Sequence, residues 1–335
     1  MFFLMKLDEF FNKCWSIYSV TTPDAPLIHR LLKERGEQVL NDHVAFRTFN
    51  LPGISRLELG KIFEDWGYRR ADEELDFPEK KLKASYYLHP DSQNPKVFIS
   101  ELLLERVSKD LQEWIRDFTS PSMKSAKPSA EIFLKPAWKP VRYAEYQRFY
   151  SESEYAAWTA AFSIQVNHFT VFVNSLSTFK SLQELNAFLK SHGMKLNASG
   201  GEVKGTPDQL LEQSSTEARR IPWKFAENET QNVMGCYYEF ARRYPLPGTD
   251  QLFQGFIPAS ADKIFESTFE KKKKSDCNGW TFISLEKQIG CFALFINIIR
   301  YPSLSSLRLK TFTAKPIFIF EPLLIHLPVQ KNCWE

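Results

Sequence analysis

The sequence predicts an α+β protein in which two modules of the same element order, strand, helix and three strands, form a central β-sheet or barrel. Each module opens with a run of apolar, β-branched or aromatic residues that has a histidine at its start, over 43–49 and 167–174. A helix follows each strand, over about 55–66 and 181–191, and a glycine follows each helix, as is usual at helix C-termini. The two halves share little residue identity, so the repeat is one of element order.

The first module spans about residues 40–105, behind a helical cap over 1–40. Two helices are expected in the cap, at 7–20 and 24–38. The second rests on apolar residues at helical spacing after a Thr/Pro/Asp start, namely Leu27, Ile28, Leu31 and Leu32. After the helix at 55–66, the module continues with extended segments at 68–77, 83–88 and 97–104.

An insertion at 106–164 separates the modules, because helical sequence there is interrupted by four prolines: Pro121, Pro128, Pro136 and Pro140. The second module spans about 165–245. After its helix it has short strands near Lys195, at 217–225 and at 235–243. The modules, cap and insertion make one domain, residues 1–276.

The C-terminal segment 277–335 differs from the rest of the chain. It has six Lys/Arg against three Asp/Glu, so the whole net charge of +3 lies there, together with three of the five cysteines. It follows the charged run 271–276 and has no sustained period of 2 or 3.6 residues. We treat it as a separate tail without an assigned structure.

Composition and charge exclude several classes of protein. With 43% hydrophobic and 25% charged residues the chain is not disordered, and a net charge of +3 is too small for a protein that mainly binds nucleic acid or an anionic membrane. Five widely spaced cysteines without a Cys-x-x-Cys pair indicate neither a disulfide framework nor a thiolate zinc site. The apolar runs are too short for a signal peptide or a membrane span, so we expect a soluble, cytoplasmic protein. Nucleotide-binding glycine motifs and a Gly-x-Ser-x-Gly elbow do not occur.

Three polar residues in apolar strands are candidates for a metal site. His43 and His168 hold equivalent places at the start of the two modules, where a buried imidazole needs a partner or a ligand role. Glu239 lies among aromatic residues, and a buried carboxylate likewise needs a partner or a metal. Two histidines and one carboxylate form the facial triad of non-haem Fe(II) enzymes.

Other interpretations of these residues stay open, because they lie far apart in the sequence and nothing local brings them together. Each histidine, taken alone, is more often a hydrogen-bonded core residue. Glu239 is as well explained by a salt bridge to Arg242 or Arg243, or by exposure on an edge strand.

Arg47 is the main substrate-binding candidate. It lies on the same strand face as His43, with their Cα atoms about 13 Å apart, and its planar guanidinium suits a carboxylate. A small dicarboxylate would bridge a metal at His43 and this guanidinium. Arg243, on the face of Glu239, and Ser214, in the polar segment 213–216, are weaker candidates. An outward-facing arginine and a polar turn are the plainer alternatives.

Five segments in this order resemble the 2-oxoadipate dioxygenase/decarboxylase family, also called hydroxyglutarate synthase. The resemblance covers about residues 5–276. The segments are 41–48 (Asn-Asp-His-Val-Ala-Phe-Arg-Thr), 98–102 (Phe-Ile-Ser-Glu-Leu), 167–170 (Asn-His-Phe-Thr), 211–216 (Leu-Glu-Gln-Ser-Ser-Thr) and 236–242 (Cys-Tyr-Tyr-Glu-Phe-Ala-Arg). That family is similar to the vicinal oxygen chelate enzymes, whose paired modules enclose a metal. Residues 277–335 match nothing in the family pattern.

The resemblance implies an Fe(II) enzyme of lysine catabolism that converts 2-oxoadipate and O2 to 2-hydroxyglutarate and CO2. Carried over by position, His43, His168 and Glu239 would be the iron ligands and Arg47 the carboxylate anchor. The choice of iron rests on the resemblance, since the same ligands would bind manganese or cobalt.

Two other functions stay open at this point. The same metal site would serve a different 2-oxo acid or another reaction, such as an isomerisation. Alternatively, the chain is a non-catalytic binding protein in which the two histidines and the glutamate are ordinary core residues. The oligomeric state is not predicted.

Overall fold

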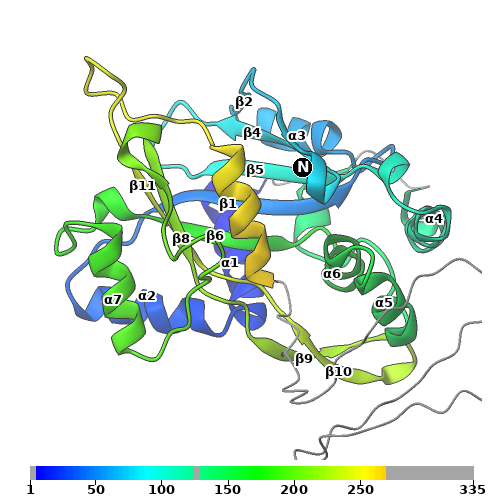
Figure 1. Ribbon diagram of the computed structural model, residues 1–335. Coiled ribbons are helices and arrows are strands. Elements are labelled where there is room, and N and C mark those ends of the chain that lie inside the picture. Colours follow the sequence, from blue (N-terminus) through cyan, green and yellow to red (C-terminus); the bar gives the residue numbers. More distant parts are fainter. Residues whose placement is uncertain (1–4, 124–127, 269–335) are drawn as a thin grey trace, which may run out of the picture. The chain divides into compact units, whose positions relative to one another are not determined.

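The computed structural model describes residues 5–123 and 128–268. The chain divides into two compact units, Met1–Lys271 and Lys272–Glu335. The second unit lies outside the described residues, as does the predicted tail at 277–335. In the first unit, α8 crosses one face of a curved sheet and α1 lies behind the opposite face (Figure 1).

The order of helices and strands follows the predicted one in the cap and in module one. The helices are α1 Leu7–Thr21, α2 Asp24–Glu34, α3 Arg56–Glu64, α4 Lys109–Met123, α5 Tyr143–Tyr150, α6 Glu154–Phe162, α7 Leu182–Ser191 and α8 Pro258–Ile264. The strands are β1 Asn41–Phe49, β2 Arg69–Arg70, β3 Leu75–Phe77, β4 Leu82–Leu88, β5 Lys96–Leu102, β6 Val166–Phe172, β7 Lys204–Thr206, β8 Leu211–Ser215, β9 Arg220–Lys224, β10 Thr230–Met234 and β11 Glu239–Arg243. A 3₁₀ turn, Phe265–Thr268, continues α8. None of the helices in these residues is long and apolar enough to cross a membrane.

The sheet has the same strand order outward from its centre in both directions. Among the described residues it runs β2-β4-β5-β1-β6-β11-β8-β7, with β3 paired to β4. In module one β1 pairs in parallel with β5, and β5 is antiparallel to β4; in module two β6 pairs in parallel with β11, and β11 is antiparallel to β8. The modules join where β1 and β6 run antiparallel. This arrangement confirms the predicted α+β fold with a repeated module.

Helix ends follow local chemistry. Ser55 caps α3 with a capping box that includes Glu58, and Gly67 after the helix has a φ of +89°, which glycine adopts without steric cost. The second cap helix is shorter than predicted, since α2 ends at Glu34 instead of residue 38. The helix ends there because Gly36 has a φ of +88°, and the backbone N–H groups of Gly36 and Glu37 donate to carbonyls of the last helical turn.

The strand predictions for module two are wrong in detail. The strand expected near Lys195 is only an isolated bridge between Leu196 and Thr216. The segment at 217–225 does not join the module, because β9 pairs with β10 in a separate two-stranded sheet. The strand beside β11 is β8, whose five residues are all buried although four of them are polar. A polar strand of this kind has no apolar alternation in its sequence. The last strand also begins at Glu239 instead of residue 235.

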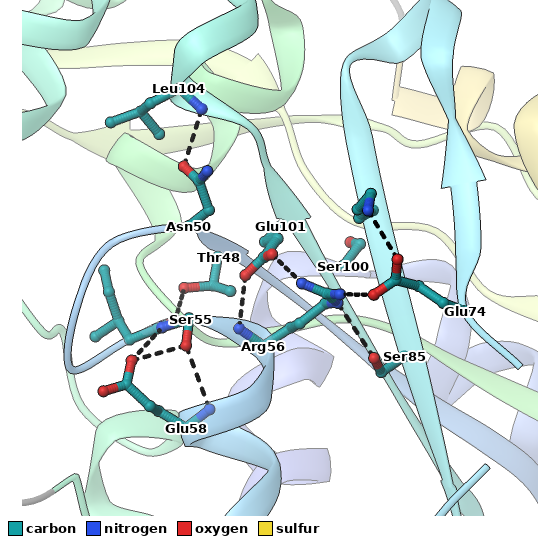
Figure 2. A network of polar contacts seen from close by, with 12 residues as sticks. Thr48, Asn50, Ser55, Arg56, Glu58, Glu74, Ser85, Ser100, Glu101 and Leu104 are labelled. Atoms are coloured by element: carbon teal, nitrogen blue, oxygen red, sulfur yellow. Dashed lines mark hydrogen bonds and ion pairs between the residues drawn. The ribbon is translucent and has the colours of Figure 1, made fainter. Parts of the chain in front are cut away.

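A buried ion-pair network holds α3 against module one (Figure 2). The guanidinium of Arg56 contacts the carboxylates of Glu101 and Glu74, and its Nε donates to Ser85 at 3.2 Å. The Glu101 carboxylate also accepts from the backbone N–H of Arg56 at 2.8 Å. Arg56 and Glu101 are both buried, whereas Glu74 is partly exposed. The pair fixes the first turn of α3 to β5.

Arg56→Met is therefore expected to lower the free energy of unfolding by about 3–5 kcal/mol, because it leaves the buried Glu101 charge without its cation. Urea unfolding at neutral pH measures the change. Arg106→Met is the matched control, since the Arg106–Asp76 pair is exposed and should contribute less than about 1 kcal/mol. Equal losses in both variants would contradict this interpretation of the network.

Candidate metal centre

The strand register brings the first candidate residues side by side. His43 pairs with Thr170 across β1 and β6, and Thr170 pairs with Glu239 across β6 and β11. Directly paired residues of neighbouring strands point to the same face of a sheet. His168 pairs with Ala45, two residues after His43, and so continues the same face one row further along. Residues 125 and 71 positions apart along the chain therefore meet at the junction of the two modules.

The three candidate ligands lie close enough to share one metal ion. One ligand atom from each of His43, His168 and Glu239 lies within 4.8 Å of the others, and all three residues are buried. The carboxylate lies 3.2 Å from His168 Nε2 and 3.8 Å from His43 Nε2. Neighbouring ligands at about 2.1 Å from one metal lie about 3 Å apart, so this donor set fits a divalent metal with a small inward adjustment.

His43 is held by buried partners behind it. Its Nδ1 donates to Asp42 at 2.8 Å, which leaves Nε2 as the nitrogen that faces the site. Asp42 accepts two further bonds from Arg243, at 2.6 and 2.9 Å, and lies 3.5 Å from Lys96. The Thr170 hydroxyl lies 3.1 Å from Nε2 and donates to its lone pair when no metal is bound. Burial lowers the pKa of His43, so the ring is neutral and able to bind a metal at pH 7.

His168 has a similar arrangement from module two. Its Nδ1 lies 3.1 Å from Asn167 Oδ1, again from the preceding residue, and Nε2 faces Glu239. The Tyr237 ring stacks on the imidazole, with centroids 4.7 Å apart and planes at 26°. Burial lowers the pKa of His168 well below its ordinary value, and the neighbouring charges of His43 and Arg47 act in the same direction. Both histidines are thus neutral candidate ligands with a fixed orientation.

Glu239 is the candidate carboxylate ligand. Its side chain is 1% exposed and accepts a hydrogen bond from Gln213 Nε2 at 2.6 Å. Burial raises the pKa of Glu239 to about 8, and the Gln213 hydrogen bond opposes this effect. Without a cation nearby, this carboxyl is therefore mostly protonated at neutral pH.

Arg47 lies on the same face but is already engaged. One terminal nitrogen donates to Glu154 at 3.1 Å and the other to Thr268 at 3.0 Å. The guanidinium also lies over the rings of Tyr155 and Trp158, at 4.9 and 4.8 Å from their centroids. Its Nε has no hydrogen-bond partner within the described residues. Arg47 is thus held through both terminal nitrogens, and Nε is the nitrogen that has no partner in this part of the chain.

The two weaker candidates have other roles. Arg243 donates from Nε and one terminal nitrogen to Asp42, and from the other terminal nitrogen to two backbone carbonyls. Four of its five N–H groups are thus engaged, and its main role is to orient Asp42. Ser214 pairs with Phe240, on the face away from Glu239, and its hydroxyl donates to Asn186 on α7. The structure therefore does not support Arg243 or Ser214 as substrate-binding residues. In both cases the reason is a hydrogen bond to a segment distant in the sequence.

A small cavity opens beside the three candidate ligands. It has a volume of about 20 Å³, which holds about one water molecule. Its walls are mostly apolar, and α8 with the following 3₁₀ turn closes it. The lining residues are His43, Phe98, His168, Gln213, Tyr237, Glu239, Phe256, Ala261, Ile264 and Phe265.

Three residues of the site were not singled out from the sequence. Asp42 is a charged residue directly before His43, and Tyr237 lies two positions before Glu239, so strand alternation would have indicated its face. Gln213 is part of the noted polar segment, but only the pairing of β8 with β11 places it beside Glu239.

Comparisons with known proteins agree with this geometry. A family model described as 2-oxoadipate dioxygenase/decarboxylase matches residues 19–254. The chain belongs to this family. It is 36% identical over 282 residues to the 2-oxoadipate dioxygenase/decarboxylase, chloroplastic, of Arabidopsis thaliana, over 77% of this chain and 76% of the relative.

Two solved structures extend the comparison. The hydroxyglutarate synthase of Oryza sativa, solved in complex with 2-oxoadipate, has a TM-score of 0.71 and 34% identity, over 77% of this chain and 90% of that chain. A glyoxalase superfamily protein of Ralstonia eutropha JMP134 has a TM-score of 0.61 at 19% identity, over 74% of this chain and 84% of that one. The second likeness shows the fold alone. This chain thus shares its fold with a glyoxalase superfamily protein, in agreement with the predicted fold.

Proposed function

We propose that this protein is an Fe(II)-dependent dioxygenase that converts 2-oxoadipate and O2 into 2-hydroxyglutarate and CO2 in lysine catabolism. The observation that carries the proposal is the buried cluster of His43, His168 and Glu239 in a member of the 2-oxoadipate dioxygenase/decarboxylase family. The rice relative was solved with 2-oxoadipate, which supports a small 2-oxo acid as the ligand. The cytoplasmic localisation stays a prediction.

The three ligands would hold the metal from one side, as in the 2-His-1-carboxylate sites of non-haem iron enzymes. When bound, Fe(II) supplies adjacent open positions for a 2-oxo acid and O2 and the redox chemistry that joins them. The hydrogen bonds from His43 and His168 to Asp42 and Asn167 keep both Nε2 atoms directed at that position.

We assign Arg47 the role of carboxylate anchor. Glu154 and the two aromatic rings fix its guanidinium, so little side-chain entropy is lost when a ligand binds. Arg47 Nε, which has no hydrogen-bond partner among the described residues, is the donor that we assign to the substrate.

Apolar side chains keep water out of the site. Phe98 on β5, Phe256 in the loop before α8 and Phe265 in the turn after α8 line the cavity. Because the cavity holds about one water molecule, side chains that line it have to move apart when a six-carbon acid enters.

Oxygen uptake tests the proposed reaction. Protein loaded anaerobically with Fe(II) should consume O2 when 2-oxoadipate is added and should form an equal amount of 2-hydroxyglutarate, and His168→Ala should do neither. 2-Oxoglutarate and branched 2-oxo acids are the comparison substrates. No uptake by folded protein that holds iron would reject 2-oxoadipate as substrate, and failure to hold iron would favour a binding protein.

Metal binding is expected to release close to one proton at pH 7. The Glu239 pKa of about 8 means that the carboxyl is mostly protonated in the metal-free protein, and it must ionise to bind a cation. Calorimetric titration in two buffers of different ionisation enthalpy measures the release. At pH 9 the release should vanish, because the group is already ionised. A binding enthalpy independent of the buffer at pH 7 would contradict the raised pKa.

A further inference from the structure

Tyr237 has a buried hydroxyl beside the candidate metal centre. The residue is fully buried, lines the cavity and stacks on His168. Its hydroxyl has no hydrogen-bond partner within the described residues. Leaving a buried hydroxyl unpaired is unfavourable, and a phenylalanine would fill the same space without that penalty. A group of this kind next to a candidate active site points to a ligand that accepts its hydrogen bond.

A second unpaired donor lies on the same side of His168. Arg47 follows Ala45 by two residues on β1, and Ala45 is the direct partner of His168. Tyr237 precedes Glu239 by two residues and contacts His168 from the neighbouring strand. Tyr237 therefore lies level with His168, and Arg47 lies one row further from His43. Arg47 Nε and the Tyr237 hydroxyl are both buried, and neither has a hydrogen-bond partner in residues 5–123 and 128–268.

We propose that the Tyr237 hydroxyl and Arg47 Nε together bind the carboxylate of the substrate that lies away from the metal, so that Tyr237 selects dicarboxylic 2-oxo acids over monocarboxylic ones. The inference rests on the proposed function, and it adds Tyr237 as a specificity-determining residue. A carboxylate accepts several hydrogen bonds at once and so satisfies both donors.

The dimensions agree with this assignment. Two residues along a strand span about 7 Å, the offset between Glu239 and Tyr237. A six-carbon diacid in extended form spans about 6 Å between its terminal carbons, from bond lengths of about 1.5 Å. A ligand with one end at the three candidate metal ligands would thus bring its other end to Tyr237.

The neighbouring Tyr238 provides a matched control. It is also fully buried, and its hydroxyl also lacks a partner within the described residues. Its ring, however, packs with Trp15, Tyr18 and Phe240 on the other face of the sheet. Tyr238→Phe therefore makes the same chemical change outside the site.

Ligand binding to the metal-loaded protein without O2 tests the inference, with 2-oxoadipate and 2-oxohexanoate as probes. The second acid has the same chain but a methyl group in place of the remote carboxylate. In Tyr237→Phe the affinity for 2-oxoadipate should fall about ten- to one-hundredfold, the usual effect of losing a hydrogen bond to a charged group, and the affinity for 2-oxohexanoate should not change. Tyr238→Phe should leave both affinities as in the wild type.

Two further measurements separate an effect on ligand binding from an effect on the metal site or on protein stability. The metal content of Tyr237→Phe should equal that of the wild type, and the Tm of its metal-free form should be equal or higher, because an unpaired hydroxyl is removed. An unchanged affinity for 2-oxoadipate in Tyr237→Phe would overturn the inference alone. The inference would also be overturned if Tyr237→Phe lost the same affinity for both acids or lost its metal. The same would follow if Tyr238→Phe lost as much affinity for 2-oxoadipate as Tyr237→Phe. A wild-type protein that binds metal but not 2-oxoadipate would overturn the proposed function and this inference with it.

Discussion

Glu239→Gln is expected to empty the metal site and to lower the rate of O2 uptake roughly a thousandfold or more. Glu239 is the only carboxylate in the cluster with His43 and His168 among the described residues. A glutamine keeps the size of the side chain but removes the negative charge that a divalent metal requires from this ligand set. Metal analysis after gel filtration and an oxygen electrode measure the two effects.

The same substitution should stabilise the metal-free protein. Burial raises the pKa of Glu239 from 4.5 to about 8, so ionisation of this carboxyl opposes folding. This contribution to the free energy of unfolding is favourable below about pH 4.5 and is lost as the pH rises to about 8. At pH 7 the neutral glutamine should therefore add roughly 3 kcal/mol, measured by urea unfolding without metal.

Glu212→Gln is the control for both effects. Glu212 is a buried carboxylate on β8 that accepts a hydrogen bond from the Tyr244 hydroxyl, on the face opposite to Gln213. Its substitution should leave the metal content unchanged. If Glu239→Gln retained stoichiometric metal, the carboxylate would not be a ligand and the centre would have to be reassigned.

Asp42→Asn is expected to affect the stability and the metal site together. Asp42 is fully buried and binds the buried Arg243 through both oxygens, and it also accepts from His43 Nδ1. The neighbouring cations, Arg243 above all, hold the pKa of Asp42 well below its ordinary value against the effect of burial. An asparagine leaves Arg243 as a buried charge without a counterion, which should lower the free energy of unfolding by about 3–5 kcal/mol.

The metal affinity of Asp42→Asn should also fall, by about ten- to one-hundredfold, since His43 loses the carboxylate that orients it. Metal titration of the folded variant at low temperature separates this effect from unfolding. Asp24→Asn is the matched control, because Asp24 is also buried but pairs with the half-exposed Arg219 far from the site. A normal metal affinity in Asp42→Asn would show that His43 keeps its orientation without Asp42.

Much of the site could be predicted from residues that stand out in their strands. His43, His168 and Glu239 are polar residues among apolar and aromatic ones, and such residues need a partner when buried. The structure brings these three together. Arg47 followed from strand alternation, but its pairing with Glu154 and Thr268 did not, because those residues come from the insertion and from the turn after α8.

Other parts of the fold could not be predicted from the residues of a single segment. The polar strand β8 is buried on both sides because β11, β7, α7 and α8 surround it, and its own residues do not show this. The segment at 217–225 has the composition of a strand of the module, yet its partner is β10. Which strands pair depends on the free energy of the whole sheet and not on one segment.

The sequence by itself determined the repeated module, the three metal-ligand candidates and the family, because periodicity, isolated polar residues and ordered motifs are properties of short segments. Only the tertiary structure decided that Arg243 supports Asp42, that Ser214 faces away and that Tyr237 lies in the cavity. Those roles depend on which side chains meet across the sheet, and that is settled by the strand register and by packing between segments distant in the chain.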